Sequence, residues 1–223
     1  MEKHIIKILA IDHVTHDTLR ILTEKPEGYT FEPGQATDIA INKNGWKDER
    51  RPFTFTSLSS DPHLEFIIKT YPSHDGATDK LLHTHVGDEL ILHEVFGSIR
   101  YKGEGVFIAG GAGVTPFVAM LRALDKTGNV GNNRMIYANK TTADIILREE
   151  LETLLGDRLV HILSEEQTAG YAHGLITEEF LKARSGNLNG YFYVCGPMPM
   201  MEAINKQLAA LGVAPGNIVK EGW

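Results

Sequence analysis

The sequence has little cysteine, no long apolar run and no excess of positive charge. Cys195 is the single cysteine among 223 residues, which excludes a disulfide framework or an all-cysteine iron–sulfur cluster built from this chain alone. The formal net charge of −7 argues against a nucleic-acid-binding protein, because such proteins usually carry a basic face. No apolar run could span a bilayer, and the first residues lack a signal-peptide pattern. We therefore expect a cytoplasmic protein with no membrane span.

Histidine, a common metal ligand, occurs ten times. The pairs His83 with His85 and His13 with His16 have no convincing third ligand in the sequence, and a structural metal site usually needs four. We expect no metal site.

Short β-rich segments separated by turns fill the first hundred residues. Apolar, β-branched and aromatic residues predict six strands, at 5–11, 18–23, 36–41, 53–58, 64–71 and 89–95. A brief helix is expected at 77–85, before the last strand. Six strands with turns at this spacing predict an antiparallel six-stranded β-barrel over residues 1–101.

Strands alternate with helices in the second half, after a boundary at residues 102–105. Strands are expected at 106–109, 134–139, 159–163, 191–195 and 218–220, and helices at 115–125, 145–155, 177–183 and 199–211. This alternation predicts an α/β domain over residues 106–223 with a doubly wound parallel sheet. Ligands gather at the carboxyl ends of the strands in such sheets.

A glycine-rich turn, Gly110-Gly111-Ala112-Gly113, follows the first of these strands. Glycine lets the backbone turn tightly and approach a ligand closely, Thr115 is expected to cap the next helix, and Pro116 suits its first turn. The turn departs from the dinucleotide fingerprint because Pro116 stands in place of the third glycine. Taken alone, it also fits an ordinary loop between a strand and a helix.

The barrel half contains the segment Arg51-Pro52-Phe53-Thr54. It combines a phosphate-binding guanidinium, an aromatic face and a hydroxyl. Strand alternation places Arg51 and Phe53 on one face and Thr54 on the other. By itself the segment is equally consistent with a half-buried strand that carries an ordinary surface arginine.

Taken together and in this order, these segments resemble the motifs of the ferredoxin–NADP reductase superfamily of flavin oxidoreductases, over essentially the whole chain. The four motifs are Arg-x-aromatic-Ser/Thr at 51–54, a phosphate-binding Gly-x-Thr form at 76–78 that is one residue shorter than usual, Gly-Gly-x-Gly-x-Thr-Pro at 110–116, and Cys-Gly-Pro-x-Pro-Met at 195–200.

The resemblance implies a flavin site in the barrel. Arg51 would hold the flavin pyrophosphate, Phe53 would pack on the flavin and Thr54 would hydrogen-bond near the reactive N5. Trp223 corresponds to a terminal aromatic that covers the flavin in many relatives, although a frayed terminus is the alternative. The full set of expected flavin contacts is Arg51, Pro52, Phe53, Thr54, Ile67, Lys69, Gly76, Ala77, Thr78 and Trp223. FAD is the expected cofactor, in preference to FMN.

The resemblance also implies a nicotinamide nucleotide site in the α/β domain. Thr115 and Cys195 would shape the nicotinamide pocket, with the thiol acting by contact, and together with Thr54 they are the expected catalytic residues. Asp144 would repel a 2′-phosphate, whereas Lys140 could pair with one, so the balance favours NADH over NADPH. The expected nucleotide contacts are Gly110, Gly111, Gly113, Thr115, Pro116, Asn139, Asp144, Cys195, Gly196, Pro197 and Met198.

The implied function is a monomeric reductase that passes a hydride from NAD(P)H to flavin N5 and electrons on to a small carrier protein such as ferredoxin or flavodoxin. Lys43, Lys47, Arg50 and Arg51 form a basic cluster that would suit an acidic carrier. A free-flavin or small-molecule reductase, an electron-transfer subunit of a larger reductase, and a flavin-binding sensor remain open.

Overall fold

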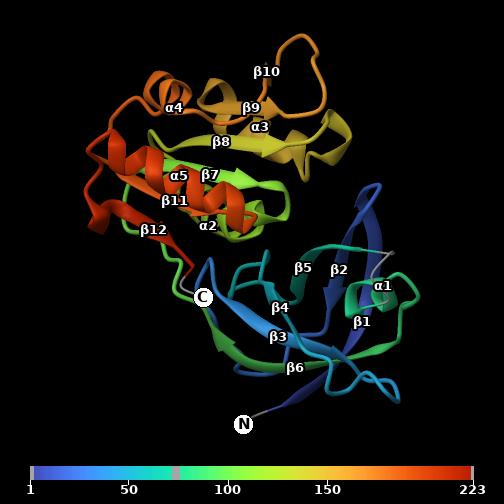
Figure 1. Ribbon diagram of the computed structural model, residues 1–223. Helices are drawn as coiled ribbons and strands as arrows, with labels where there is room; N and C mark the ends of the chain where they lie inside the picture. Colours follow the sequence, from blue (N-terminus) through green and yellow to red (C-terminus); the bar gives the residue numbers. More distant parts are fainter. Residues whose placement is uncertain (1–2, 72–75, 222–223) are drawn as a thin grey trace. The chain divides into compact units, whose positions relative to one another are not determined.

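The chain folds into two compact units, Met1–Ser98 and Ile99–Trp223, in a computed structural model that describes residues 3–71 and 76–221 (Figure 1). The first unit is built from strands and one short helix, and the second alternates strands with helices. Among the described residues, no helix is both long and apolar enough to cross a membrane.

The first unit contains six antiparallel strands. They are β1 (His4–Thr15), β2 (Thr18–Thr23), β3 (Ala36–Ile41), β4 (Arg51–Thr54), β5 (Leu64–Lys69) and β6 (Glu89–Phe96), and their order in the sheet is β4-β3-β6-β1-β2-β5. Burial alternates along β1, so that Ile6 and Ile8 are buried while their neighbours Lys7 and Leu9 are exposed. This alternation places one face of the sheet on a core, as expected for a barrel wall.

The two end strands of this sheet meet just beyond β4. Phe55 and Phe66 form an antiparallel bridge, and the amide of Thr56 donates to the carbonyl of Glu65 at 2.9 Å. Phe55 also packs in the core of this unit, where its ring stacks on that of Phe31 with centroids 4.0 Å apart. The sheet therefore closes into the expected barrel around an apolar interior.

The second unit contains a six-stranded parallel sheet. Its strands are β7 (Gly105–Gly110), β8 (Arg134–Asn139), β9 (Leu159–Leu163), β10 (Ala172–His173), β11 (Tyr191–Cys195) and β12 (Ile218–Lys220), in the order β10-β9-β8-β7-β11-β12. The strands pair in parallel throughout. The sheet confirms the predicted doubly wound α/β fold.

Four helices cover the two faces of this sheet. They are α2 (Thr115–Lys126), α3 (Arg148–Leu155), α4 (Glu178–Arg184) and α5 (Met198–Ala210), and α5 lies in front of β7 and β11 in Figure 1. Val106 and Ile108 of β7 pack in one core with residues of α4 and α5. Phe107, which points the other way, contacts Phe117 of α2 with ring centroids 5.1 Å apart. A strand buried on both faces is accordingly apolar at successive positions.

The direction of the winding reverses between β7 and β11. The chain goes from β7 outward to β8 and β9, and then returns to the other side of β7 as β11 and β12. Such a reversal leaves a crevice outside the carboxyl ends of the two central strands. The glycine-rich turn follows β7 and the Cys-Gly-Pro segment follows β11, so both predicted nucleotide motifs stand at this switch point.

Several elements differ from the sequence prediction, among them β1, which runs on to Thr15, and β10, which was not expected. The strand expected at 53–58 is β4 at Arg51–Thr54, because the chain turns where the Leu58 amide donates to the Asp61 carboxylate at 2.7 Å. The helix expected at 77–85 is α1 (Ala77–Leu81). The helix expected from residue 145 begins at Arg148, since Leu147 adopts a left-handed φ of 51°.

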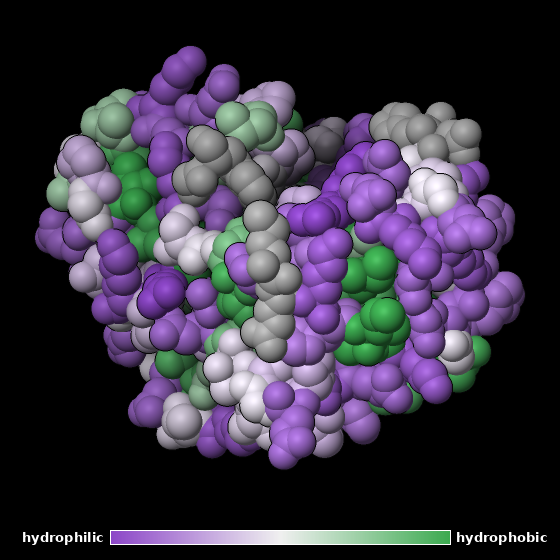
Figure 2. Space-filling model, turned by 90° about the horizontal axis from the view of Figure 1, so that it is seen from below, coloured by the Kyte–Doolittle hydropathy of each residue, from purple (hydrophilic) through white to green (hydrophobic). Residues whose placement is uncertain are grey.

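Apolar side chains also occur at the surface. In the view of Figure 2 they form small patches among hydrophilic side chains. Leu175 and Val86, for example, are 76% and 63% exposed. Scattered apolar residues are normal on a folded protein and need no partner to explain them.

Candidate functional site

The predicted flavin motif lies on β4, at one end of the strand order of the first unit. β4 pairs with β3, so that Phe53 is opposite Thr37 and Thr54 is opposite Ala36. Phe53 and Thr54 are partly buried, with Phe53 packed against the barrel core, whereas Arg51 is exposed. The motif therefore presents a cationic group to solvent beside a ring that is anchored in the core.

Arg51 keeps most of its hydrogen-bonding capacity. One terminal nitrogen donates to the carbonyl of Arg50 at 2.6 Å, and the other lies 3.4 Å from the carboxylate of Glu49. A guanidinium carries five N–H donors and binds phosphate in a bidentate manner. Because these two contacts are local and exposed, the side chain fits the role of holding a pyrophosphate group.

The other predicted flavin contacts are spread over β5 and α1. Ile67 is buried, Gly76 precedes α1, Ala77 is buried and Thr78 is partly exposed. These four positions are compatible with the expected roles without testing them. Trp223 lies outside the described residues.

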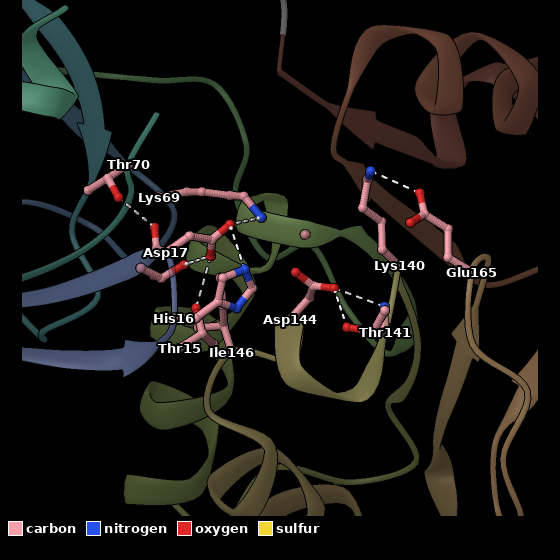
Figure 3. Close-up of polar contacts among 12 residues, drawn as sticks. Thr15, His16, Asp17, Lys69, Thr70, Lys140, Thr141, Asp144, Ile146 and Glu165 are labelled. Atoms are coloured by element: carbon pink, nitrogen blue, oxygen red, sulfur yellow. Dashed lines mark hydrogen bonds and ion pairs between the residues drawn. The ribbon is translucent and has the colours of Figure 1, made fainter. Parts of the chain in front are cut away.

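Lys69 of β5 is engaged inside the first unit. Its ammonium lies 2.8 Å from the carboxylate of Asp17 in the turn between β1 and β2 (Figure 3). Burial raises the pKa of Asp17, but hydrogen bonds from Lys69, Thr15 and Thr18 outweigh it and lower the pKa overall. A contact of Lys69 with the flavin stays a prediction, and such a contact would compete with this ion pair.

The glycine-rich turn of the second unit is one turn of 3-10 helix between β7 and α2. It spans Gly111–Val114, and Gly111 adopts a φ of 52°, which disfavours residues with a Cβ. A Cβ built at Gly111 would find nothing within 4 Å. The turn is therefore open on this side, so its backbone can be approached by a ligand.

The sequence predicted that Thr115 caps α2, and this prediction is wrong. The helix has no side-chain cap and its N-cap residue is Val114. The Thr115 hydroxyl instead donates to the carbonyl of Ala112 at 3.0 Å, because the 3-10 turn continues directly into the helix. Pro116 lies in the first turn of α2 as expected. Thr115 is 7% exposed, and its hydroxyl holds the turn in shape.

Gly113 brings the two nucleotide motifs into contact. A Cβ at this position would lie 2.6 Å from the amide nitrogen of Gly196 and closer still to the carbonyl of Cys195. The turn after β7 and the segment after β11 therefore pack backbone against backbone. Pro197 follows as the N-cap residue of α5, and Met198, the first residue of α5, is exposed.

Cys195 ends β11 beside this contact. Burial, with a smaller contribution from the carboxylate of Glu221, raises the pKa of its thiol to about 12. The thiolate is the reactive form of cysteine, so the thiol stays protonated at neutral pH. This protonated form favours a contact surface over a nucleophile, and the role of Cys195 at the nicotinamide stays a prediction.

Tyr137 of β8 is a supporting residue that sequence reasoning missed. Its hydroxyl donates to the carbonyl of Gly111 at 3.1 Å and accepts from the amide of Ile146 at 3.3 Å. It is fully buried, and this burial raises its pKa. One hydroxyl thus fixes the glycine turn to the loop after β8. An isolated tyrosine in an apolar strand carries no sequence signal for such a role.

Asn139, the last residue of β8, is buried with unused hydrogen-bonding capacity. Its side chain lies close enough to Tyr137 to lower the pKa of that hydroxyl. Even so, neither polar atom of its amide has a hydrogen bond of ordinary geometry to a described residue. A buried amide without such bonds costs stability. A buried amide in this position, beside the glycine turn, is suited to binding a polar ligand.

The loop after β8 is rich in hydrogen bonds to carboxylates. Asp144 accepts from the Thr141 amide at 2.9 Å and from the Thr141 hydroxyl at 2.7 Å. The ammonium of Lys140 lies 2.9 Å from the carboxylate of Glu165 (Figure 3). The acidic residue predicted to repel a 2′-phosphate is thus held in place, and the lysine that would favour one is paired.

The comparisons with known proteins assign a domain type to each unit. Residues 3–95 match the model of the FAD-binding domain, and residues 107–206 match that of the oxidoreductase NAD-binding domain. The chain thus carries an FAD-binding domain followed by an NAD-binding domain.

Relatives and solved structures agree with this assignment. The reductase component of propane 2-monooxygenase from Mycolicibacterium goodii is 33% identical over 232 residues, covering 96% of this chain and 64% of that protein. NADH-cytochrome b5 reductase 2 from Mycosarcoma maydis is 30% identical over 217 residues, covering 85% of this chain and 60% of the relative. The chain thus spans under two thirds of the length of either relative.

The fold has a close counterpart among solved structures. A ferredoxin NADP+ reductase from Neisseria gonorrhoeae with bound FAD and NADP superposes with a TM-score of 0.87 at 20% identity, covering 99% of this chain and 98% of that one. At this identity the likeness concerns the fold. Together with the two domain matches, it shows an FAD-binding domain and an NAD-binding domain arranged in the chain order and fold of that reductase.

Proposed function

We propose that the chain is the FAD- and NADH-binding part of a reductase that passes electrons from NADH to a protein acceptor. The observation that carries this proposal is the switch point of the second unit, where the open turn at Gly111–Val114 packs through Gly113 on the segment after β11. A crevice of this kind binds nucleotides in doubly wound sheets. The two domain matches supply the identity of both cofactors.

The bound flavin would supply the chemistry, by accepting a hydride at N5 and releasing the electrons to an acceptor. The residues of the chain bind and orient. Arg51 holds the pyrophosphate, Phe53 contacts the ring system and Thr54 donates a hydrogen bond near N5. In the second unit Thr115 fixes the turn, and the protonated thiol of Cys195 contacts the nicotinamide without forming a bond to it.

NADH is the proposed donor because the loop after β8 offers little to a 2′-phosphate. The carboxylate of Asp144 would repel such a phosphate, and it already accepts hydrogen bonds from the amide and the hydroxyl of Thr141. Asn139, whose buried amide makes no hydrogen bond of ordinary geometry to a described residue, is the proposed contact to the nucleotide.

The proposed acceptor is an electron-carrier or oxygenase protein. Relatives with similar sequences are named as reductase components of monooxygenase and dioxygenase systems. The basic cluster of Lys43, Lys47, Arg50 and Arg51 is a weaker docking surface than its sequence suggests. Lys43 lies 2.7 Å from the carboxylate of Asp88, and Arg51 lies 3.4 Å from that of Glu49.

Stopped-flow mixing of the FAD-loaded protein with NADH, and separately with NADPH, tests the proposal. We expect rapid loss of the oxidised-flavin absorbance with NADH and slower loss with NADPH. A protein that binds FAD but is bleached by neither nucleotide would be a flavin-binding sensor, and the proposal would be wrong. If the reduced protein passes its electrons only to free flavin, the proposal of a protein acceptor would be wrong.

A further inference from the structure

Two consecutive glutamates, Glu165 and Glu166, follow β9 and lie against the loop after β8. The pairing of β8 with β9 continues past both strands, since the Ser164 amide donates to the Asn139 carbonyl at 3.0 Å and the Glu165 amide donates to the Lys140 carbonyl at 2.9 Å. The backbone therefore fixes the position of both glutamates beside residues 140–142.

Each glutamate binds a cationic or hydrogen-bond-donating group that could otherwise bind a phosphate. The carboxylate of Glu165 lies 2.9 Å from the ammonium of Lys140. The carboxylate of Glu166 accepts from the Thr142 amide at 2.7 Å and from the Thr142 hydroxyl at 2.9 Å. An ammonium, a backbone N–H and a hydroxyl are the usual ligands of a phosphate group.

Asp144 completes the same pattern by taking up the amide and hydroxyl of Thr141. The donors of residues 140–142 are thus directed to three carboxylates from two loops. The ion pair with Glu165 also raises the pKa of Lys140, so the lysine stays charged and its charge is matched by a carboxylate. A phosphate placed here would meet occupied donors and negative charge.

We propose that Glu165 and Glu166 are specificity-determining residues that exclude a 2′-phosphate and so make the chain prefer NADH to NADPH. This inference rests on the proposed function, in which the loop after β8 faces the adenosine ribose of the nucleotide. The carboxylates act by repulsion and by competing for donors, which is how a site discriminates against a ligand that differs by one charged group.

The variants Glu165→Gln, Glu166→Gln and the double variant test the proposal. The amide keeps the shape of each side chain and removes its charge. We expect the double variant to raise kcat/KM for NADPH by about tenfold or more, because two like charges near the phosphate are removed. The value for NADH should change by less than about twofold, since NADH lacks that phosphate. Glu202→Gln, an exposed site on α5, is the matched control and should leave both values unchanged.

A binding measurement separates recognition from catalysis. Adenosine 2′,5′-bisphosphate and 5′-AMP differ in the 2′-phosphate, so their inhibition constants against NADH report on this group alone. We expect the double variant to improve inhibition by the bisphosphate and not by 5′-AMP. If the wild-type protein oxidises NADH but neither the NADPH preference nor the bisphosphate inhibition changes in the double variant, this inference is wrong and the proposed function stands. If the wild-type protein oxidises neither nucleotide, the proposed function itself fails.

Discussion

Among the residues of the glycine-rich turn, Gly113 has the most clearly defined steric requirement. A Cβ there would overlap the backbone of Cys195 and Gly196, and backbone cannot move aside as a flexible side chain can. We expect Gly113→Ala to destabilise the second unit by about 1–3 kcal/mol, the usual cost of overpacking. Urea unfolding of the wild-type and variant proteins measures the difference.

Gly216 provides the matched control for this substitution. It lies in the same unit without a positive φ, and a Cβ there would find nothing within 4 Å. Gly216→Ala should leave the free energy of unfolding within about 0.5 kcal/mol of the wild-type value. Equal effects at both positions would show that close packing of the two motifs is not what Gly113 provides.

Arg51 is the residue that tests the flavin site. Its guanidinium contacts Arg50 and Glu49 locally and at the surface, so its removal should cost the chain little stability. We expect Arg51→Ala to weaken FAD binding by roughly 1.5–3 kcal/mol, the value of a charged hydrogen bond to phosphate. Fluorescence titration of the apoprotein with FAD measures this loss. Lys47→Ala removes an exposed charge from the same basic cluster and should retain normal affinity, whereas unchanged affinity in Arg51→Ala would contradict the assignment.

Candidate site residues could be predicted from the sequence where their chemistry is visible in a motif. Arg51, the glycines and Cys195 could be named because their types and spacing are unusual. Tyr137 and Glu165 could not be named, because a tyrosine in an apolar strand and a glutamate in a loop are both ordinary. Their roles come from parallel strand pairing, which places the loops after β7, β8 and β9 side by side.

At the level of elements, the closure of the barrel depends on a buried carboxylate. Glu65 of β5 is 4% exposed, lies 2.6 Å from the guanidinium of Arg20 and accepts from the Thr56 hydroxyl at 2.8 Å. We expect Thr56→Val to destabilise the first unit by about 1–3 kcal/mol, because the buried carboxylate loses a donor. Urea unfolding measures this change. Thr30→Val, at an exposed loop position, should have little effect, and a neutral Thr56→Val would rule out this account of closure.

Strand β9 contains a buried histidine that should make stability depend on pH. His161 has a side chain 8% exposed, and neither ring nitrogen hydrogen-bonds to a described residue. Burial lowers its pKa, with Glu152 opposing this effect and Arg148 reinforcing it. The unfolded chain, with a histidine pKa of about 6.5, therefore binds the proton more readily. Stability should be fully present above this pKa and decline as the pH falls below it.

Urea unfolding at pH 7.5 and pH 5.5 checks this prediction. The His161→Leu variant should lose less stability between the two pH values than the wild-type protein. His173→Gln replaces an exposed histidine in the same unit and should keep the wild-type difference. An identical decline in His161→Leu would assign the pH dependence to other groups.

The helices and strands were predictable where a periodic apolar pattern ran to a clear stop. β2, β3, β8, β9, β11 and β12 have the predicted bounds. The two-residue strand β10 was missed because its length leaves no period to detect. The start of α3 was misplaced since nothing in the residue types at 145–147 signals the left-handed φ of Leu147. Local backbone geometry of this kind is set by tertiary contacts, which a pattern does not contain.

At the scale of the whole molecule, the two units should respond separately to the two ligands. The FAD-binding match ends at residue 95 and the NAD-binding match begins at residue 107, close to the division between units after Ser98. A ligand stabilises the unit that binds it. We expect FAD alone to slow amide hydrogen exchange in β3 and β4.

NAD+ added without FAD should act on the other unit, and hydrogen exchange resolved by peptide tests this. We expect protection at residues 110–116 and 139–144, because the open turn at Gly111 and the buried amide of Asn139 are the proposed contacts. The double variant of Glu165 and Glu166 should show the same protection with NAD+ and gain protection with NADP+. Protection by NAD+ confined to the first unit would contradict the placement of the nucleotide at the switch point between β7 and β11. That outcome would leave the FAD site untouched, because its test depends on FAD alone.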